Sequence, residues 1–333
     1  MDSQNKLFAH QEQLVFSLAN YYNQVTVVTA KSGIYRHKEN LEVVEFGWNQ
    51  GQIIRNSMKL LRVVIPIFLK DRKIIIFCHM TDAFSAVIAP VAYFLRMKHY
   101  LWYAHAIKSR YLRFAAFFVT EIFTSTPGSC PISNDKIKVI GQAIDTEKFV
   151  QQVWNKTKIF DLVHVGRIDP SKQIEKLIDA VIGCALECKN LKLTFIGEPS
   201  SLKHMDYYLQ ILNRYKKNIA SGQLVFLGAI ANDELTKALE QYGGFFHAFH
   251  GSLDKALLEA TFVGLPVITI NEEYLREFVD ISQLSTSATL EERLLNYTKL
   301  APHEIQNNIE INRNIAMEKH SLKQWLDKIV QLM

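Results

Sequence analysis

The sequence predicts an α/β protein made of two doubly wound, Rossmann-like domains with parallel sheets, facing each other across a cleft. Along both halves of the 333 residues, short runs rich in β-branched and aromatic residues alternate with helical patterns, as expected of strand–helix–strand units. The short runs are apolar throughout, which is typical of parallel strands buried on both faces. The chain length suits two domains of ordinary size.

The first domain is predicted over residues 1–150. Its expected strands are Val25–Thr29, Leu41–Phe46, Lys73–Cys78, Tyr100–Ala104, Glu121–Ser125 and Lys136–Ile140. Helical patterns fall between several of these strands, for example at His10–Tyr22 and Thr81–Met97.

The second domain is predicted over residues 151–318. Its expected strands are Ile159–Val165, Leu191–Ile196, Gln223–Leu227, Gly244–Ala248 and Pro266–Ile270. Its expected helices are Gln173–Glu187, His204–Ala220, Asn232–Gln241 and Lys255–Val263. A terminal helix, residues 319–333, is expected to cross back to the first domain. Because ligands of such sheets bind beyond the carboxyl ends of the strands, we expect the site in the cleft.

Composition limits the class of protein further. Hydrophobic residues make up 48% of the chain and charged residues 21%, a balance that excludes a disordered or fibrous protein. No apolar run approaches the roughly 18 residues of a spanning helix, and the polar N-terminus lacks a signal-peptide core. We therefore expect a cytoplasmic protein. The four cysteines are too few for a disulfide framework, and we expect reduced, packed thiols.

Positive charge is concentrated in the first domain. Residues 1–150 carry a net charge of +7, and between Arg55 and Arg113 eleven Lys and Arg face only two acidic residues, a net +9. Apolar and aromatic residues interleave with these cations. One interpretation is a solvated basic surface over ordinary core helices. The other is a patch that sits on anionic lipid at the inner membrane face. No nucleic-acid motif accompanies the charge, so we expect no nucleic-acid partner.

Two motifs carry cations and a carboxylate to the predicted site. In the first, VGRIDPSK (residues 165–172), a strand ends at Gly166, and Arg167 and Lys172 follow on the loop before a helix. Arg can bridge two phosphate oxygens and Lys supplies a compact charge, so the pair suits a diphosphate. The alternative is two solvated loop charges.

The second motif lies in residues 249–268. We predict that Ser252 caps the following helix, which leaves the backbone N–H groups of Leu253, Asp254 and Lys255 free to bind an anion. Glu259 lies two turns further along the same helical face, where it could accept hydrogen bonds from ribose hydroxyls. The alternative is a surface Glu on an amphipathic helix.

Together the motifs resemble those of glycosyltransferase family 4, of the GT-B fold. The family's carboxyl-terminal signature is matched in order by VGRIDPSK, by LVFLG at residues 224–228 and by LLEATFVGLPVI at residues 257–268. VIGQAIDTEKF at residues 139–149 is similar to the family's interdomain segment. LWYAH at residues 101–105 stands where the family carries a histidine at the cleft.

The resemblance implies a role for each candidate residue. The donor diphosphate would be held by Arg167 and Lys172, with Gly166. The nucleotide ribose would be bound by Glu259. His105 would face the transferred sugar. The alternative is that His105 simply packs against its neighbours Trp102 and Tyr103. The other implied donor contacts are Ala229 and Ile230 near the base, His250 near the sugar, and the loop residues Gly251, Ser252, Leu253 and Lys255.

The chain departs from the family in two places. The family has a second glutamate eight residues before Glu259, where this chain has Gly251; Asp254 or His250 could substitute only in part. Relatives also open with an apolar strand, whereas this chain begins at the segment expected after it. We expect that either the first sheet lacks a strand or further residues precede Met1.

We therefore predict a retaining, hexosyltransferase-type glycosyltransferase that moves a sugar from a nucleotide diphosphate donor to a glycan or lipid-linked acceptor, with His105 and Asp254 as catalytic candidates. No Asp-x-Asp occurs in the sequence, so we expect no metal and no cofactor; cations and the helix dipole would stabilise the leaving nucleotide. The alternatives are a non-catalytic nucleotide-sugar-binding or partner subunit and a nucleotide-sugar epimerase of the same fold.

Overall fold

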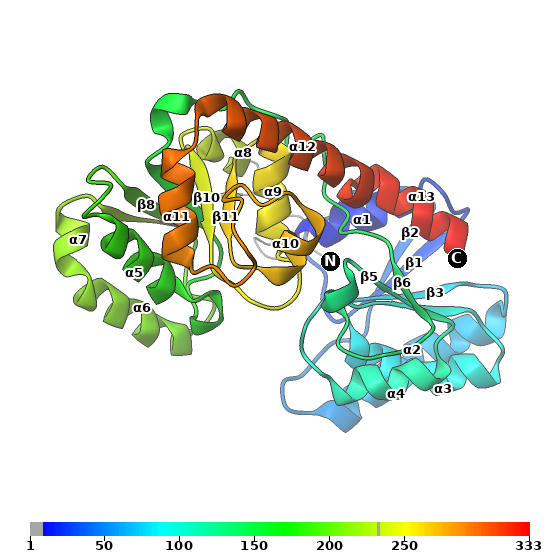
Figure 1. The fold of residues 1–333 in the computed structure, drawn as a ribbon. Coiled ribbons are helices and arrows are strands. Elements are labelled where there is room, and N and C mark those ends of the chain that lie inside the picture. The colour runs from blue at the N-terminus through cyan, green and yellow to red at the C-terminus, as the bar shows by residue number, and fades with distance from the viewer. Residues whose placement is uncertain (1–8, 232–233) are drawn as a thin grey trace. The chain divides into compact units, whose positions relative to one another are not determined.

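The computed structural model describes residues 9–231 and 234–333, which divide into two compact units. Unit 1 contains the residues up to Ala143 together with Lys323–Met333, and unit 2 contains Ile144–Leu322. Both are α/β units (Figure 1), and every paired strand in the described residues is parallel. The predicted α/β class with parallel sheets is therefore confirmed.

The division falls a few residues away from the predicted boundaries at 150/151 and 318/319. Ile144 pairs with Ser321 in an isolated parallel bridge. The Ile144 amide donates to the carbonyl oxygen of His320 at 2.8 Å, and its carbonyl accepts from the Leu322 amide at 2.7 Å. These bonds hold both connecting segments in unit 2.

Unit 1 contains α1 (Ala9–Leu18), β1 (Val25–Thr29), β2 (Leu41–Glu45), α2 (Ile53–Lys70), β3 (Ile76–His79), α3 (Asp82–Phe94), β4 (His99–Trp102), α4 (Arg110–Phe118), β5 (Glu121–Thr124), β6 (Ile137–Val139) and nearly all of α13 (Leu322–Leu332), with a 3₁₀ turn at Pro127–Ser129. A four-stranded sheet has the order β3-β4-β5-β6, and β1 and β2 pair separately. In the described residues β1 is the first strand, and each of its residues is only half-buried.

Helices cover both faces of the four-stranded sheet. On one face α2, α3 and α4 lie together (Figure 1) and pack on Cys78 and Leu101. On the other face α13 buries Trp325, whose ring lies 6.1 Å from Phe77 and 5.6 Å from Trp102. Neighbouring strand residues point to opposite faces, which accounts for the two separate packings.

Unit 2 contains β7 (Asp161–Val165), α5 (Ile174–Cys184), β8 (Lys192–Ile196), α6 (Leu202–Arg214), α7 (Lys216–Ala220), β9 (Leu224–Gly228), α8 (Leu235–Leu239), β10 (Gly244–His247), α9 (Lys255–Val263), β11 (Val267–Thr269), α10 (Glu272–Glu277), α11 (Leu290–Lys299) and α12 (Pro302–His320), with 3₁₀ turns at Lys156–Lys158 and Pro170–Lys172. The sheet order is β11-β10-β7-β8-β9. The chain therefore leaves β7 in one direction along the sheet and later returns to pair β10 on its other side. This reversal between β7 and β10 is the topological switch point, where such sheets bind ligands.

Two predicted helices differ from the structure. The helix expected at His204–Ala220 is broken at Tyr215 into α6 and α7; the Tyr215 hydroxyl donates to Asp179 Oδ1 at 2.7 Å and its ring is buried. The helix expected at Asn232–Gln241 begins at two residues that lie outside the described part of the chain, and α8 covers only its middle.

Three glycines follow or end neighbouring strands of unit 2 at their carboxyl edge. Gly166 follows β7, Gly197 follows β8 and Gly228 ends β9. The Gly166 amide donates to Ile196 O at 3.0 Å, and the Gly197 amide donates to Gly228 O at 2.9 Å. A Cβ on Gly197, whose φ is +150°, would lie 1.8 Å from the Gly166 carbonyl oxygen. Only glycine allows the two loops to approach this closely.

We expect Gly197→Ala to destabilise unit 2 by roughly 2–4 kcal/mol, because backbone must move to relieve the clash. Urea unfolding measures the loss. Gly222→Ala is the matched control, since Gly222 also has a positive φ (+76°) but a Cβ there meets nothing within 4 Å. Gly222→Ala should lower the free energy of unfolding only by the roughly 1–2 kcal/mol that a left-handed backbone conformation costs a residue with a side chain. An equal loss of unfolding free energy in both variants would contradict the claim that the close approach of the Gly166 carbonyl requires glycine at position 197.

Candidate functional site

Two loops meet at the switch point of unit 2. One connects β7 to α5 and carries Arg167 and Lys172; the other connects β10 to α9 and carries His250 to Asp254. Because β7 and β10 are adjacent and parallel, their carboxyl ends place both loops at one edge of the sheet. The structure thus brings together the two motifs, which are more than 80 residues apart in the sequence.

The loop after β7 is shaped by Asp169. This buried carboxylate accepts from the Ser171 amide at 3.0 Å and from the Ser171 hydroxyl, and it caps the short turn Pro170–Lys172. Arg167 Nε lies 3.5 Å from Asp169 Oδ2, while the Arg167 side chain remains 49% exposed. Arg167 therefore presents much of its guanidinium to solvent at the carboxyl edge, available to an anionic ligand.

An ion pair joins the two loops. Lys172 Nζ binds Asp254 Oδ2, with both side chains largely buried. The same Lys172 Nζ lies 4.5 Å from the centre of the Phe249 ring, a cation–π contact. His247 Nε2 lies 3.2 Å from the same Asp254 oxygen. Lys172 is thus held at one point by a carboxylate and an aromatic face.

The protonation states in this cluster follow from burial and charge. Burial alone would raise the pKa of Asp254, but Lys172 and the His247 hydrogen bond overcome this and hold the pKa far below its ordinary value. Burial lowers the pKa of His247, although Asp254 opposes the shift. His247 is therefore neutral near pH 7 and donates from Nε2 to Asp254, while Nδ1 accepts from Thr269 Oγ1 at 3.1 Å.

The loop after β10 begins its helix later than predicted. Helix α9 starts at Lys255, and its N-cap is Asp254, whose Oδ1 accepts from the Ala256 amide at 3.4 Å. The prediction that Ser252 caps this helix is wrong. Ser252 is buried, and its carbonyl oxygen accepts from Asn271 Nδ2 at 3.2 Å. Leu253 is buried as well, so its side chain packs in the core.

The neighbouring Asn271 fixes the path of this loop. Its Nδ2 also donates to Phe249 O at 3.0 Å, while its Oδ1 caps helix α10. Within the loop, Gly251 has φ +121°, a conformation that side-chain-bearing residues rarely adopt. A residue with a side chain would be strained in this backbone conformation. His250, beside it, is exposed.

Glu259 lies on helix α9, one turn beyond Lys255. Lys255 Nζ and Glu259 Oε1 are 3.8 Å apart, and the Glu259 side chain is only 13% exposed. Burial raises the pKa of Glu259, an effect that Lys255 partly opposes. In its ionised form the Glu259 carboxylate can only accept hydrogen bonds, and Lys255 lies beside it.

The remaining predicted residues lie as follows. Ala229 and Ile230 follow Gly228 at the carboxyl edge of unit 2 and are half-buried. His105 belongs to unit 1, where it is exposed three residues after β4, and its ring packs edge-on against Tyr103 at 5.9 Å. His164, interpreted from the sequence as a core residue, is fully buried, and its Nδ1 lies 3.0 Å from Phe246 O.

Sequence reasoning missed His247, Phe249 and Asn271. All three act on Lys172 or on the loop that carries Asp254. Their positions at the carboxyl ends of β10 and β11 were a usable signal, because polar residues at strand ends near a switch point tend to serve the site. Their contacts, however, could not be inferred from spacing.

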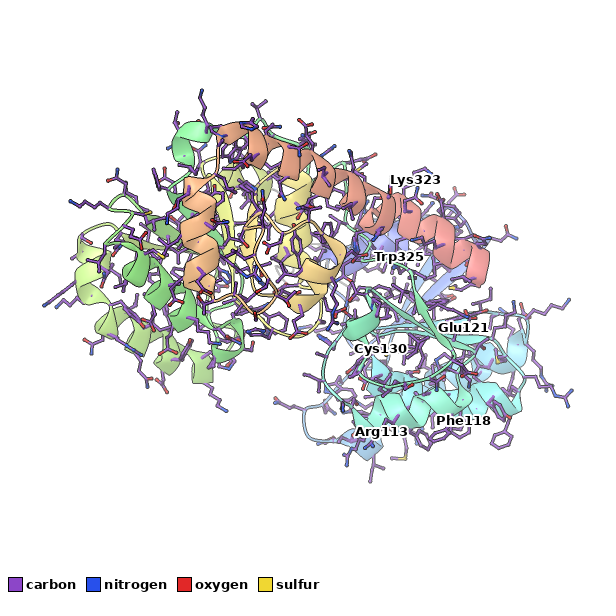
Figure 2. The ribbon with its side chains drawn as sticks, viewed as in Figure 1. Arg113, Phe118, Glu121, Cys130, Lys323 and Trp325 are labelled. Carbon is purple, nitrogen blue, oxygen red and sulfur yellow. The ribbon has the colours of Figure 1, made fainter. Side chains whose placement is uncertain are left out.

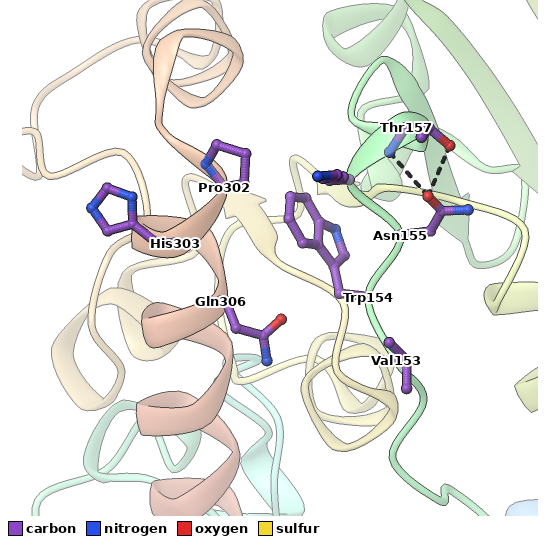
Figure 3. A pocket seen from close by; sticks show the side chains of 8 residues that line it. Val153, Trp154, Asn155, Thr157, Pro302, His303 and Gln306 are labelled. Atoms are coloured by element: carbon purple, nitrogen blue, oxygen red, sulfur yellow. Dashed lines mark hydrogen bonds between the residues drawn. The ribbon is translucent and has the colours of Figure 1, made fainter.

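Away from the loops at the switch point, unit 2 has a concavity of about 580 Å³ (Figure 3). Its lining includes Trp154, Asn155, Pro302 and His303. Trp154 Nε1 donates at 2.8 Å to Gly243 O, the residue before β10, so this concavity lies at the amino edge of the sheet. The topology therefore separates it from the loops at the switch point.

Across residues 9–231 and 234–333, no group of three or more His, Cys, Asp or Glu could hold a metal ion. The four cysteines are free thiols, as expected.

The chain is similar to known proteins in part of its sequence and in its fold. Residues 159–292 match the family model described as Glycosyl transferases group 1. HepE from Anabaena, solved with UDP and glucose, is similar with a TM-score of 0.74 and 16% identity, over 99% of this chain and 97% of that chain. Sucrose-phosphate synthase from Thermosynechococcus elongatus is similar with a TM-score of 0.73 and 12% identity, over 99% of this chain and 93% of that chain. A glycosyltransferase from Rickettsia africae is similar with a TM-score of 0.70 and 11% identity, over 96% of this chain and 93% of that chain.

No curated protein matches the sequence. The fold is nevertheless that of the GT-B glycosyltransferases, matched over nearly the whole chain. The family match in unit 2 and these structures together support a glycosyltransferase.

We expect Asp254→Asn to destabilise the protein by about 2–4 kcal/mol at pH 7, because Lys172 would lose its buried partner. Since the folded pKa of Asp254 lies below its ordinary 3.8, the stabilisation is complete above that pH and is lost as the pH falls through and below it. The difference between wild type and variant should therefore be largest at pH 7 and shrink below about pH 5 in urea unfolding.

Asp327→Asn is the control, because Asp327 pairs with Lys323 at an exposed site. This substitution should lower the free energy of unfolding by less than about 1 kcal/mol. A loss in Asp254→Asn that stays constant with pH would indicate altered packing rather than lost charge.

Proposed function

We propose that the chain transfers a sugar from a nucleoside diphosphate donor, with the donor bound at the switch point of unit 2. The observation that carries this proposal is the convergence of Arg167 and Lys172 with helix α9 at one edge of the sheet. Guanidinium, ammonium and helix N-terminus are all groups that bind diphosphate. That HepE was solved with UDP and with UDP-glucose favours a nucleotide-sugar donor.

Each group has a distinct part in this proposal. Arg167 and Lys172 would neutralise the charge that develops on the departing diphosphate. Glu259 would accept hydrogen bonds from the ribose, Ala229 and Ile230 would lie near the base, and His250 near the sugar. His105 is proposed to face the transferred sugar.

Asp254 is proposed to act mainly through Lys172. Both of its oxygens already have partners, Ala256 N for one and Lys172 and His247 for the other. It would therefore keep Lys172 in place for the diphosphate and be only a partial substitute for the carboxylate missing at Gly251.

The finer features are also proposed. The transfer would retain anomeric configuration, need no metal because no Asp-x-Asp pair is present in the sequence, and take place in the cytoplasm. The acceptor would be a glycan or a lipid-linked sugar, reached through the basic surface of residues 55–113 at the membrane face. The family resemblance and the net +9 of that segment support these points.

One observation favours a second candidate, a non-catalytic subunit that binds a nucleotide sugar. The backbone at Gly251, with φ +121°, leaves the loop without the carboxylate that orients the donor sugar in the resembled family. Nucleotide binding without turnover would support this second candidate.

We expect Arg167→Ala to weaken UDP binding and sugar transfer by about 10- to 100-fold, since a charge-assisted hydrogen-bonding group is lost. Calorimetry with UDP measures the affinity, and UDP release from a panel of UDP-sugars measures turnover. Arg214→Ala is the matched control, because Arg214 is 60% exposed and pairs with Glu175 elsewhere in unit 2. Unchanged affinity and turnover in Arg167→Ala would show that the site lies elsewhere.

We expect activity to persist in excess EDTA, because cationic side chains rather than a metal would stabilise the leaving diphosphate. The measurement is product formation with EDTA, compared with added Mg²⁺ or Mn²⁺. A strict requirement for either ion would refute this account of leaving-group stabilisation.

A further inference from the structure

Five aromatic side chains gather on the outer side of helices α3 and α4 in unit 1. We call them the aromatic patch: Tyr93, Phe94, Phe114, Phe117 and Phe118. Ring centres lie 5.9 Å apart for Tyr93–Phe94, 5.7 Å for Tyr93–Phe118 and 5.2 Å for Phe114–Phe118. Phe94 is 79% exposed and Phe117 75%. Exposed aromatic groups of this density mark an interaction surface.

The pattern on α4 separates this surface from the core. Leu112, Ala115 and Ala116 are buried against the sheet side. Arg110, Arg113, Phe114 and Phe117 follow i, i+3, i+4, i+7 spacing and so share the opposite face. Figure 2 shows Arg113 and Phe118 on the side of unit 1 away from Trp325. Phe114 and Phe117 are therefore presented outward by the helix, whereas Phe118 is half-buried and also packs against the core.

Four cations lie on α4 or on the segment that connects α3 to α4. We call Arg96, Lys108, Arg110 and Arg113 the basic rim; all four are exposed. None of them takes part in any salt bridge among the described residues. Residues 55–113 contain only Asp71 and Asp82 as acidic groups. The positive charge here is therefore not neutralised by the protein itself.

We propose that the aromatic patch and the basic rim form a docking surface for an anionic lipid bilayer. Aromatic rings would enter the boundary between headgroups and acyl chains, while Arg and Lys bind lipid phosphates. In the described residues no helix is long and apolar enough to cross a membrane, and the proposed contact is interfacial. This proposal deepens the proposed function, on which it rests for the lipid-linked acceptor that this surface would approach.

Charge decides between lipid and a second copy of the chain. Two copies docked face to face through this surface would place two unneutralised basic rims against each other, which is unfavourable. An anionic bilayer instead offers a complementary charge to every rim residue and an apolar layer to every ring. Lipid is therefore the occupant that both features fit.

The test is co-sedimentation of the full chain with vesicles of phosphatidylcholine alone or with added phosphatidylglycerol, without donor. We expect binding to the anionic vesicles that weakens with salt. Phe94→Ser/Phe117→Ser should lower the partition coefficient by about tenfold or more. Arg110→Gln/Arg113→Gln should lower it by about fivefold per charge. Both pairs are exposed, so folding should be preserved.

Leu186→Ser/Leu202→Ser is the matched control, because these residues of unit 2 are 91% and 89% exposed; its vesicle binding should equal that of wild type. UDP affinity, measured in parallel, should be unchanged in all three variants, so failure of this proposal is distinguishable from failure of the proposed function. Equal binding to neutral and anionic vesicles, no binding, or wild-type binding by Phe94→Ser/Phe117→Ser would overturn it. So would a dimer that this variant dissociates while vesicle binding is unaffected.

Discussion

The ion pair between Lys172 and Asp254 is the interaction on which the candidate site depends. It joins the loop after β7 to the loop after β10, across the switch point of the sheet of unit 2. His247 from the end of β10 holds the same carboxylate oxygen, and Phe249 lies under the ammonium group. Burial of the cluster makes each of these contacts stronger than it would be in water. Arg167, on the same loop as Lys172, lies 3.5 Å from Asp169 and keeps about half of its side chain exposed.

Close backbone approach is the second constraint on this edge of the sheet. Gly197 admits the carbonyl of Gly166, and Gly251 turns the loop ahead of helix α9 with a positive φ. The same backbone that brings Asp254 to Lys172 excludes a glutamate at Gly251, since side-chain-bearing residues rarely adopt that conformation. Gly251 and Asp254, which pairs with Lys172, are therefore features of one loop.

The two units have different electrostatic characters that match different partners. At the switch point unit 2 largely buries the Lys172–Asp254 ion pair, whereas α3 and α4 of unit 1 display exposed aromatic rings, and the exposed Arg110 and Arg113 of α4 take part in no salt bridge among the described residues. Paired, buried charges give geometric precision. Unpaired, exposed charges give salt-sensitive attraction to an extended surface. The proposed donor site and the proposed lipid-docking surface rest on these two different kinds of charge.

The sequence by itself determined the α/β class, the parallel sheets and nearly every strand, because buried parallel strands read as short apolar runs whose limits are local. It also determined Arg167, Lys172 and Glu259 as candidates, since their motifs are contiguous. Tertiary structure alone decided that Asp254 rather than Ser252 caps α9, that Phe249 lies against Lys172, and that His247 contacts the carboxylate paired with Lys172. Asp254 and Phe249 are each about 80 positions away from Lys172 in the sequence. A spacing pattern within one segment carries no information about a partner that only the pairing of β7 with β10 brings near.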